Sequence, residues 1–225
     1  MKDLGRAFSF VFKDPRWVSK LVIAAAFMIL SLLIVGIFVL VGYFIEMTQR
    51  VMRREEYPLP EWTDIGVKFV LGFKFVIAYV VYLLPILLLV IPIIGVSIAS
   101  AIAEQPDMMA AFVTVYIFGF TLLVIPYTLA LTLLLPIITY RFAEEGKISD
   151  ALDIGGVIRD FRGNWENTLI VALIAMAIES FAAIGLLVLV IGIFFTIFYA
   201  YAVSHYLYGA LYLNRVEREH AGVAA

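Results

Sequence analysis

The sequence predicts an all-α, polytopic membrane protein, a transmembrane helical bundle with about six membrane crossings. Apolar residues make up 64% of the 225 residues, and charged residues only 15%. Soluble domains carry roughly 25% charged residues. A soluble protein of this size could not bury so much apolar surface, and the apolar residues are gathered in four long runs. The solvent for most of this surface must therefore be lipid.

Residues 1–16 are predicted to form an amphipathic helix that lies flat in the membrane interface. The apolar residues of this segment recur at helical offsets and share one face: Leu4, Phe8, Val11 and Phe12. Pro15 ends the pattern, and Trp17 follows it at the depth of the headgroups. The apolar run that comes next is longer than a signal-peptide core, so we expect it to remain as a membrane span.

The first two apolar runs differ in what their lengths allow. Residues 18–45 are long enough for a single tilted span. Residues 65–103 form a run of 39 residues, about 58 Å as one helix, which is too long for one crossing. Two solutions remain for this run. One is an interfacial helix over 62–74 followed by a long span, and the other is a hairpin that turns near Pro85 and Pro92, with candidate spans 65–84 and 86–103.

The third and fourth runs follow the same reasoning. Residues 108–140 are predicted to form one span. The fourth run, 168–213, contains 46 residues, about 69 Å as one helix, so we expect a turn that separates spans 168–189 and 191–213. Gly185 and Gly192 are candidate turn positions. Between these two runs, residues 141–167 are predicted to form short interfacial helices.

The hydrophilic stretches are too short for a separate soluble domain, so residues 1–225 are expected to form a single membrane domain. Lys and Arg gather in cytoplasmic segments. With six crossings, the N-terminal segment, 141–167 and the C-terminus hold eleven of these residues, against three to five on the other side. With four crossings, seven Lys and Arg residues would lie on each side of the membrane. This count predicts six crossings in the cell membrane, with both termini in the cytoplasm.

Composition excludes several kinds of chemistry. The chain has no Cys and only two His, which excludes thiolate chemistry and disfavours a multi-histidine metal site. The net charge of −2 provides no basic surplus for nucleic acid. A G-x-S-x-G nucleophile motif does not occur. We therefore predict no catalytic residue, no metal ligand and no cofactor, and expect membrane lipids as partners.

Glu179 is the strongest candidate for a functional residue, because it lies within an apolar run and is expected near mid-membrane. An ionisable side chain at that depth is costly unless it is paired or protonated. If the fourth run turns near residue 190, His205 returns to a similar depth and a Glu179–His205 pair becomes possible, with Tyr201 and Ser204 nearby. Two interpretations stay open: a proton, ion or substrate site, and a neutral carboxyl that locks two helices or meets a partner subunit.

Two short segments resemble one another. Residues 12–17 precede the first apolar run, residues 159–165 precede the fourth, and each holds an Asp, an Arg and a Trp. The similarity is compatible with an internal repeat, as found in transporters, and equally with the common preference of membrane interfaces for Trp and basic residues.

A set of motifs resembles a family of multi-pass membrane proteins of unknown function from archaea and bacteria. These motifs are Asp14-Pro15-Arg16-Trp17, Gly42-Tyr43, Leu59-Pro60-Glu61-Trp62 with Gly72, and Pro136 with Tyr140-Arg141-Phe142-Ala143-Glu144-Glu145-Gly146. The resemblance spans most of the chain. It implies a helical membrane fold and a prokaryotic source, and it brings no catalytic residues.

These observations lead to two functional expectations. The first is a non-enzymatic membrane protein that acts as a structural or accessory subunit of a membrane assembly, with other membrane subunits as partners. The second is a small secondary transporter or channel that uses Glu179, which would require a water-filled cavity around that residue.

Overall fold

A computed structural model of the chain describes residues 4–103, 106–182, 185 and 189–223. Over these residues the fold is all-α and has no strand, as predicted. Four of the described helices are long and apolar enough to cross a membrane, and a fifth candidate arises if the bent pair at the N-terminus counts as one span. The chain forms two compact units: residues 1–78 with 133–225, and residues 79–132.

The predicted helix is α1 (Leu4–Lys13), but its buried face consists of Ala7, Phe10 and Val11, and only Val11 belongs to the predicted apolar face. Phe10 is buried, and its ring stacks on Tyr206 of α9 (Leu189–Val223) with the centroids 4.7 Å apart. Phe8 and Phe12 remain exposed. After α1 the chain bends by 91° into α2 (Trp17–Leu30).

The first apolar run is a helical hairpin, so the single span predicted over 18–45 is wrong. A 3-10 turn (Ser31–Leu33) separates α2 from α3 (Val35–Met52), and these two helices pack against each other. Ile34 makes the turn with a φ of 67°, which is unusual for a β-branched residue. Gly36 permits the close return, because a Cβ there would lie 2.3 Å from the carbonyl oxygen of Phe27.

Two glycines allow α3 and α4 (Ile65–Ala103) to cross with their backbones in contact. A Cβ on Gly42 would lie 1.7 Å from the carbonyl oxygen of Lys68, and one on Gly72 would lie 1.9 Å from that of Phe38. Small residues at such crossings are typical of membrane helices, where packing drives association.

The second apolar run is one uninterrupted helix. Because α4 continues through Pro85 and Pro92, the turn predicted at these prolines is wrong. Each proline removes a single backbone hydrogen bond, a loss that membrane helices tolerate. The next described helix along the chain is α5 (Pro106–Glu145).

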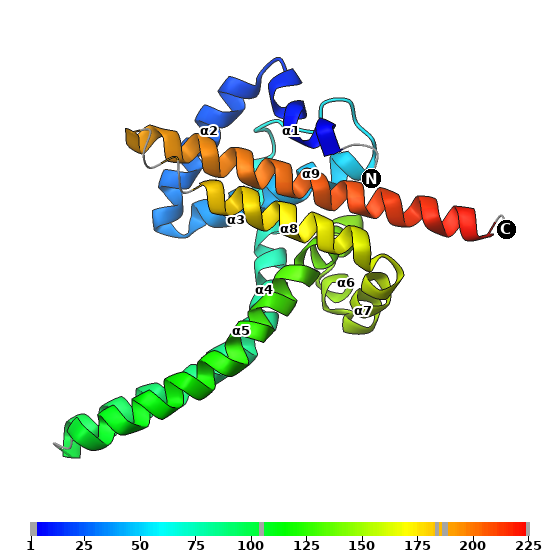
Figure 1. Ribbon diagram of the computed structural model, residues 1–225. Coiled ribbons are helices and arrows are strands. Elements are labelled where there is room, and N and C mark those ends of the chain that lie inside the picture. Colours follow the sequence, from blue (N-terminus) through cyan, green and yellow to red (C-terminus); the bar gives the residue numbers. More distant parts are fainter. Residues whose placement is uncertain (1–3, 104–105, 183–184, 186–188, 224–225) are drawn as a thin grey trace. The chain divides into compact units, whose positions relative to one another are not determined.

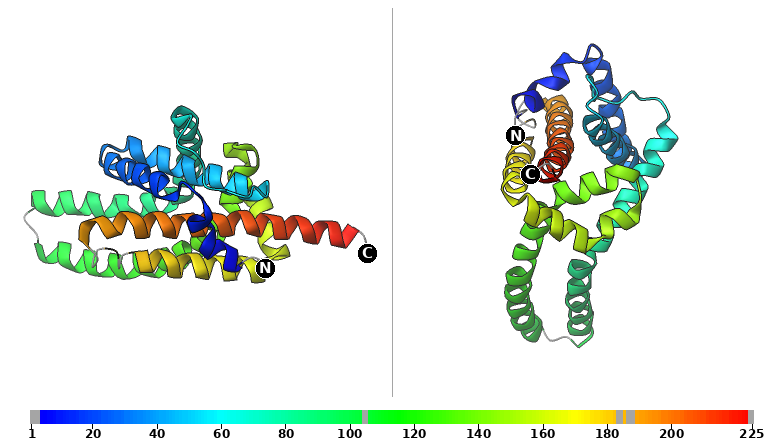
Figure 2. Two further views of the ribbon diagram at one scale, coloured as in Figure 1. Left: turned by 90° about the horizontal axis from the view of Figure 1, so that it is seen from above. Right: turned by 90° about the vertical axis from the view of Figure 1, so that its right-hand side faces the viewer.

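Side-chain contacts join α4 and α5 in each of the two units. In the first unit, the rings of Phe75 and Phe142 lie 5.2 Å apart. In the second unit, the Tyr127 hydroxyl donates to the carbonyl of Tyr82 at 2.6 Å. Figure 2 shows the two helices of the second unit as a pair. This unit exposes large apolar side chains, among them Val115, Phe118 and Leu122.

Short helices occupy the segment predicted as interfacial, 141–167. They are α6 (Ile148–Leu152) and α7 (Ile154–Gly163). The carboxylate of Asp153 caps α7 by accepting a hydrogen bond from the backbone N–H of Gly156 at 3.0 Å.

The fourth apolar run forms two helices, as its length required. It forms α8 (Trp165–Ala182) and α9, which lie side by side (Figure 1). The break falls between Ala182 and Leu189, slightly earlier than the predicted boundary at 190; Gly185 lies in it and Gly192 lies inside α9. Helices α1, α2, α3 and α8 all pack against α9, which is therefore the centre of the first unit.

Candidate functional site

Glu179 lies in the last turn of α8 and hydrogen-bonds to α9. The Ser204 hydroxyl donates to its Oε1 atom at 2.9 Å. Antiparallel packing creates this contact, because the other end of the same helix pair is joined by Asn167 and Asn214, whose side chains lie 3.1 Å apart. Glu179 therefore links two helices within the chain.

His205 faces a different helix from its neighbour Ser204. Its Nδ1 atom lies 3.0 Å from the hydroxyl oxygen of Thr48 in α3, and its ring stacks on Phe44. The predicted Glu179–His205 pair is not found among the hydrogen bonds of the described residues. The Tyr201 ring also packs against Phe44 and is partly exposed. Of the four residues singled out from sequence, the structure thus joins Glu179 to Ser204 and directs His205 and Tyr201 toward α3.

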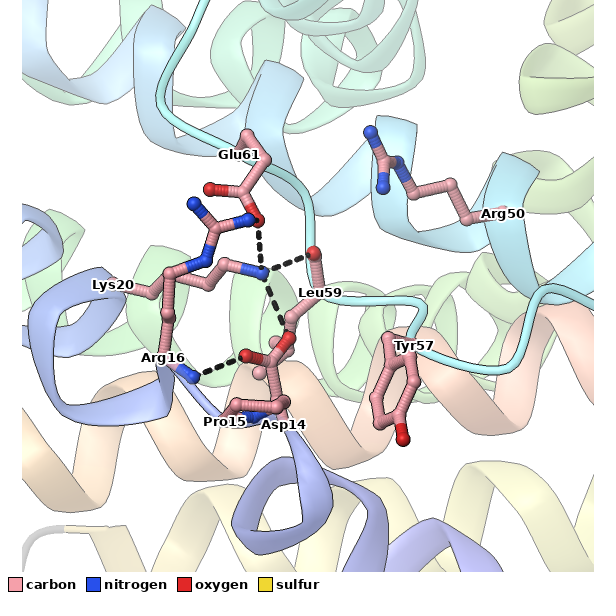
Figure 3. A pocket seen from close by; sticks show the side chains of 8 residues that line it. All are labelled: Asp14, Pro15, Arg16, Lys20, Arg50, Tyr57, Leu59 and Glu61. Atoms are coloured by element: carbon pink, nitrogen blue, oxygen red, sulfur yellow. Dashed lines mark hydrogen bonds and ion pairs between the residues drawn. The ribbon is translucent and has the colours of Figure 1, made fainter.

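A buried cluster of charged side chains surrounds Lys20, in the first turn of α2. Its ammonium group contacts three oxygens: Asp14 Oδ2 at 2.7 Å, the Leu59 carbonyl at 2.8 Å and Glu61 Oε1 at 2.8 Å (Figure 3). The side chains of Lys20 and Asp14 are each 4% exposed. Arg16 adds a second cation to Glu61 at 2.9 Å.

This cluster joins two sequence motifs that are more than forty residues apart. Besides the ion pairs, the indole N–H of Trp62 donates to the carbonyl of Lys20 at 2.9 Å. The Trp62 ring is stacked between Phe27 of α2 and Tyr43 of α3. Trp62 is thus a packing residue that fixes the 57–62 connection across the α2–α3 hairpin.

A second ion cluster lies at the crossing of α3 and α4. The Lys68 ammonium group is buried and lies 2.8 Å from Glu46 Oε2. Glu46 also contacts Arg50 one turn later at 3.2 Å, and Arg50 reaches Glu55 at 3.4 Å. The close backbone contact at Gly42 brings Lys68 within reach of Glu46.

A third cluster centres on Asp160 of α7, whose side chain is buried. Its Oδ2 atom accepts hydrogen bonds from Arg141 and Arg215 at 2.9 Å each, and from the Tyr140 hydroxyl at 3.1 Å. Arg141 extends to Asp153 at 2.6 Å. The carboxylate therefore ties the end of α5 and the last part of α9 to the α6–α7 segment.

Sequence reasoning missed the central roles of Lys20 and Asp160. Lys20 lies near the start of the first apolar run, and Asp160 lies in the 141–167 segment that is predicted to form interfacial helices. For Lys20 the available signal is the pair of motifs Asp14–Trp17 and Leu59–Trp62, which supply its two carboxylate partners. Across the described residues, no group of three or more His, Asp or Glu side chains is arranged to hold a metal ion.

Comparison with known proteins adds a family and no function. No curated protein and no solved structure matches the chain significantly. A family model described as "Protein of unknown function (DUF4013)" matches residues 26–194. The match contains Glu61, Asp160 and Glu179, whereas Asp14, Lys20 and His205 lie outside it. Because the match covers most of the chain, this protein belongs to the DUF4013 family of proteins of unknown function.

Proposed function

We propose that this protein is a non-enzymatic, multi-pass protein of the cell membrane that acts as a structural or accessory subunit of a membrane assembly. The observation that carries this proposal is the internal pairing of its intramembrane polar groups. Glu179 is bonded to Ser204, and His205 to Thr48. Polar side chains used in this way hold helices together. The apolar surface of residues 79–132 is then available for lipid and for a partner subunit.

A small secondary transporter or channel is the second candidate. Glu179 favours it, because an ionisable group in a membrane helix is by default a candidate for proton or ion movement. The described pocket with charged walls lies elsewhere, between Asp14 and Arg50. The two functions make opposite predictions for Glu179→Gln. The accessory role requires unchanged assembly and an unchanged membrane potential, whereas transport through this carboxyl requires the loss of ion or proton flux in vesicles.

The proposed topology consists of six membrane-embedded helices in three hairpins: α2 with α3, α4 with α5, and α8 with α9. A hairpin returns to the membrane face from which it starts, so both termini and the segments 53–64 and 146–164 share one face. All sixteen Lys and Arg residues then lie toward that face, and the chain segments 31–34, 104–105 and 183–188 contain none. The topology predicted from the sequence placed eleven Lys and Arg residues on one face and up to five on the other, so the present topology separates these residues more completely. This asymmetry supports cytoplasmic termini.

The three hairpins differ in how deeply they reach. Helix α2 has 14 residues, about 21 Å, which is less than the roughly 30 Å hydrocarbon core. We propose that the α2–α3 hairpin is re-entrant. Helix α8 has 18 residues, about 27 Å, which is close to the full thickness of the core. Helices α4 and α5, with 39 and 40 residues, cross it completely.

Cysteine labelling tests this topology directly, because the natural chain has no Cys and serves as the unlabelled control. Arg53→Cys and Ser149→Cys should react with an impermeant maleimide in inside-out vesicles and not in intact cells. Asp107→Cys, in the first turn of α5, should show the reverse pattern. Labelling of Arg53→Cys in intact cells would mean that α2 and α3 do not form a returning hairpin.

The accessory role is tested by photocrosslinking in native membranes. A photoreactive residue at Phe118, which is exposed on the second unit, should give one protein adduct of defined mass, and the same adduct should co-purify in constant ratio in mild detergent. Ser149, on the α6–α7 side, provides the control position. A chain that purifies as a lone monomer and crosslinks only to lipid from Phe118 would contradict the accessory role.

A further inference from the structure

Helix α7 buries one side in the first unit and leaves its other side exposed. Its buried residues are Gly156, Val157 and Asp160. Ile154 and Ile158 are 59% and 41% exposed. These two isoleucines are four residues apart, so they lie next to each other along one side of the helix. The exposed side of α7 therefore has an apolar edge.

Two arginines continue this exposed side. Arg162 follows Ile158 by four residues, and Arg159 lies three residues before Arg162, so all three side chains are neighbours on the helix surface. Both arginines are exposed, and neither forms an ion pair or a side-chain hydrogen bond with another residue that the structure describes. A guanidinium has five N–H donors in a planar fork. Both forks are therefore available to an anion from outside the chain.

Asp160 fixes which side of α7 points away from the bundle. Its side chain is buried and is held by Arg141 of α5 and Arg215 of α9 at 2.9 Å each. Ile158 and Arg162 are each two residues from Asp160, which turns them about 200° around the helix. The ion pairs that draw Asp160 into the first unit therefore hold the isoleucine edge and the arginines outward.

The exposed side of α7 carries an excess of positive charge. Near Arg159 and Arg162 in the sequence, Glu166 in the first turn of α8 is an exposed carboxylate that forms no ion pair within the described part of the chain. Asp153 is also exposed, but Arg141 already matches its charge at 2.6 Å. Two unpaired cations against one unpaired carboxylate leave one positive charge beside the apolar edge.

The position of α7 in the chain places this side at a membrane surface. The helix lies in the short connection between two candidate membrane spans, Phe112–Glu145 and Trp165–Ala182. Trp165, the first residue of α8, is 53% exposed, as is typical of an indole at the depth of the headgroups. An apolar edge flanked by arginines matches this interface, where apolar side chains enter the acyl boundary and cations meet anionic headgroups.

We propose that the exposed side of α7 binds anionic phospholipids of the adjacent leaflet. Ile154 and Ile158 enter the acyl boundary, and Arg159 and Arg162 donate to the headgroup oxygens. The sequence predicts an interfacial helix in this segment, and the structure adds which side meets the lipid and which charges select it. The inference rests on the embedding of α5 and α8 in the membrane and does not depend on the accessory role.

Fluorescence quenching by lipids tests the proposal in the reconstituted full-length protein. Because the natural chain has no Cys, Ile158→Cys can be labelled with a single bimane group. The membranes contain phosphatidylcholine and phosphatidylglycerol, and in each measurement one of the two lipids is brominated in its acyl chains. The ratio of the two quenching efficiencies gives the preference for the anionic lipid beside α7. Leu122→Cys, at an exposed position of the second unit, is the control position.

We expect both lipids to quench the label at residue 158, with phosphatidylglycerol favoured about fivefold or more, the factor for one cation near an anionic surface. The combined variant Arg159→Gln, Arg162→Gln should bring the ratio close to one. It should leave thermal stability unchanged, since neither side chain has a partner to lose. Arg54→Gln is the matched control, because Glu217 already matches the charge of this exposed arginine at 2.6 Å. This variant should keep the preference, and the label at residue 122 should show none.

A ratio near one at residue 158, or a ratio that survives the loss of both arginines, would overturn the proposal. Failure of either lipid to quench this label would also overturn it, because the exposed side of α7 would then face water or protein. Purification as a lone monomer would contradict the accessory role and leave the ratio unchanged. The two failures are therefore distinguishable.

Discussion

Replacing Lys20 by Met should destabilise the protein by about 3–5 kcal/mol, the cost of leaving a buried charge without its partner. The ammonium–carboxylate distance to Asp14 is 2.7 Å, and Coulomb's law with an effective dielectric constant of ~20 gives about 6 kcal/mol of attraction before desolvation. Most of the cost comes from Asp14, which is 4% exposed, because Glu61 is 34% exposed and can regain water.

A double-mutant cycle isolates the interaction of the pair. Asp14→Asn removes the charge and keeps a side-chain oxygen that can accept the backbone N–H of Arg16, now at 2.8 Å from Asp14 Oδ1. The combined variant should be more stable than the sum of the single effects by about 2 kcal/mol or more, because neither charge is then left unpaired.

Unfolding in mixed micelles with increasing SDS, followed by tryptophan fluorescence, measures these effects. Arg54→Met is the control, because the Arg54–Glu217 pair is 65% and 61% exposed and such pairs contribute about 0–1 kcal/mol. The reasoning fails if Lys20→Met costs no more than the control, or if the two single effects add within about 0.5 kcal/mol.

Three further variants, together with one control variant, test other parts of the fold by the same unfolding measurement. Gly42→Ala should cost about 3 kcal/mol or prevent folding, because its Cβ would lie 1.7 Å from the Lys68 carbonyl; Gly119→Ala, with open space around the Cβ, should be neutral or stabilising. Asp160→Asn should cost about 3 kcal/mol, since it leaves two arginines without their carboxylate. Glu179→Gln should change stability by less than about 1 kcal/mol, because the amide oxygen can still accept from Ser204; a larger loss would mean that the charge itself is required.

Hydropathy predicted the class of fold and the position of most helices, and it failed where a turn had no local signal. The first apolar run contains neither Gly nor Pro at residues 31–34. Its 28 residues extend about 42 Å as one helix, which a tilted span accommodates. The turn is made by Ile34 in an unusual conformation and is stabilised by the packing of α2 on α3, which no local pattern records. Pro85 and Pro92 provided a strong turn signal, and there the helix continues.

The candidate site shows a second limit, which concerns the direction of side chains. In an antiparallel hairpin, the distance of each residue from the turn determines which residues of the two helices lie at the same level. This distance was sufficient to place Glu179 beside residues 204 and 205. Successive residues of a helix point about 100° apart. One of the two must therefore face α8 while the other faces away, and depth alone cannot decide between them. In this protein Ser204 faces α8, and His205 faces Thr48 of α3. Because α9 lies between α3 and α8, two polar residues that are adjacent in sequence point in different directions, and each hydrogen-bonds to a different helix.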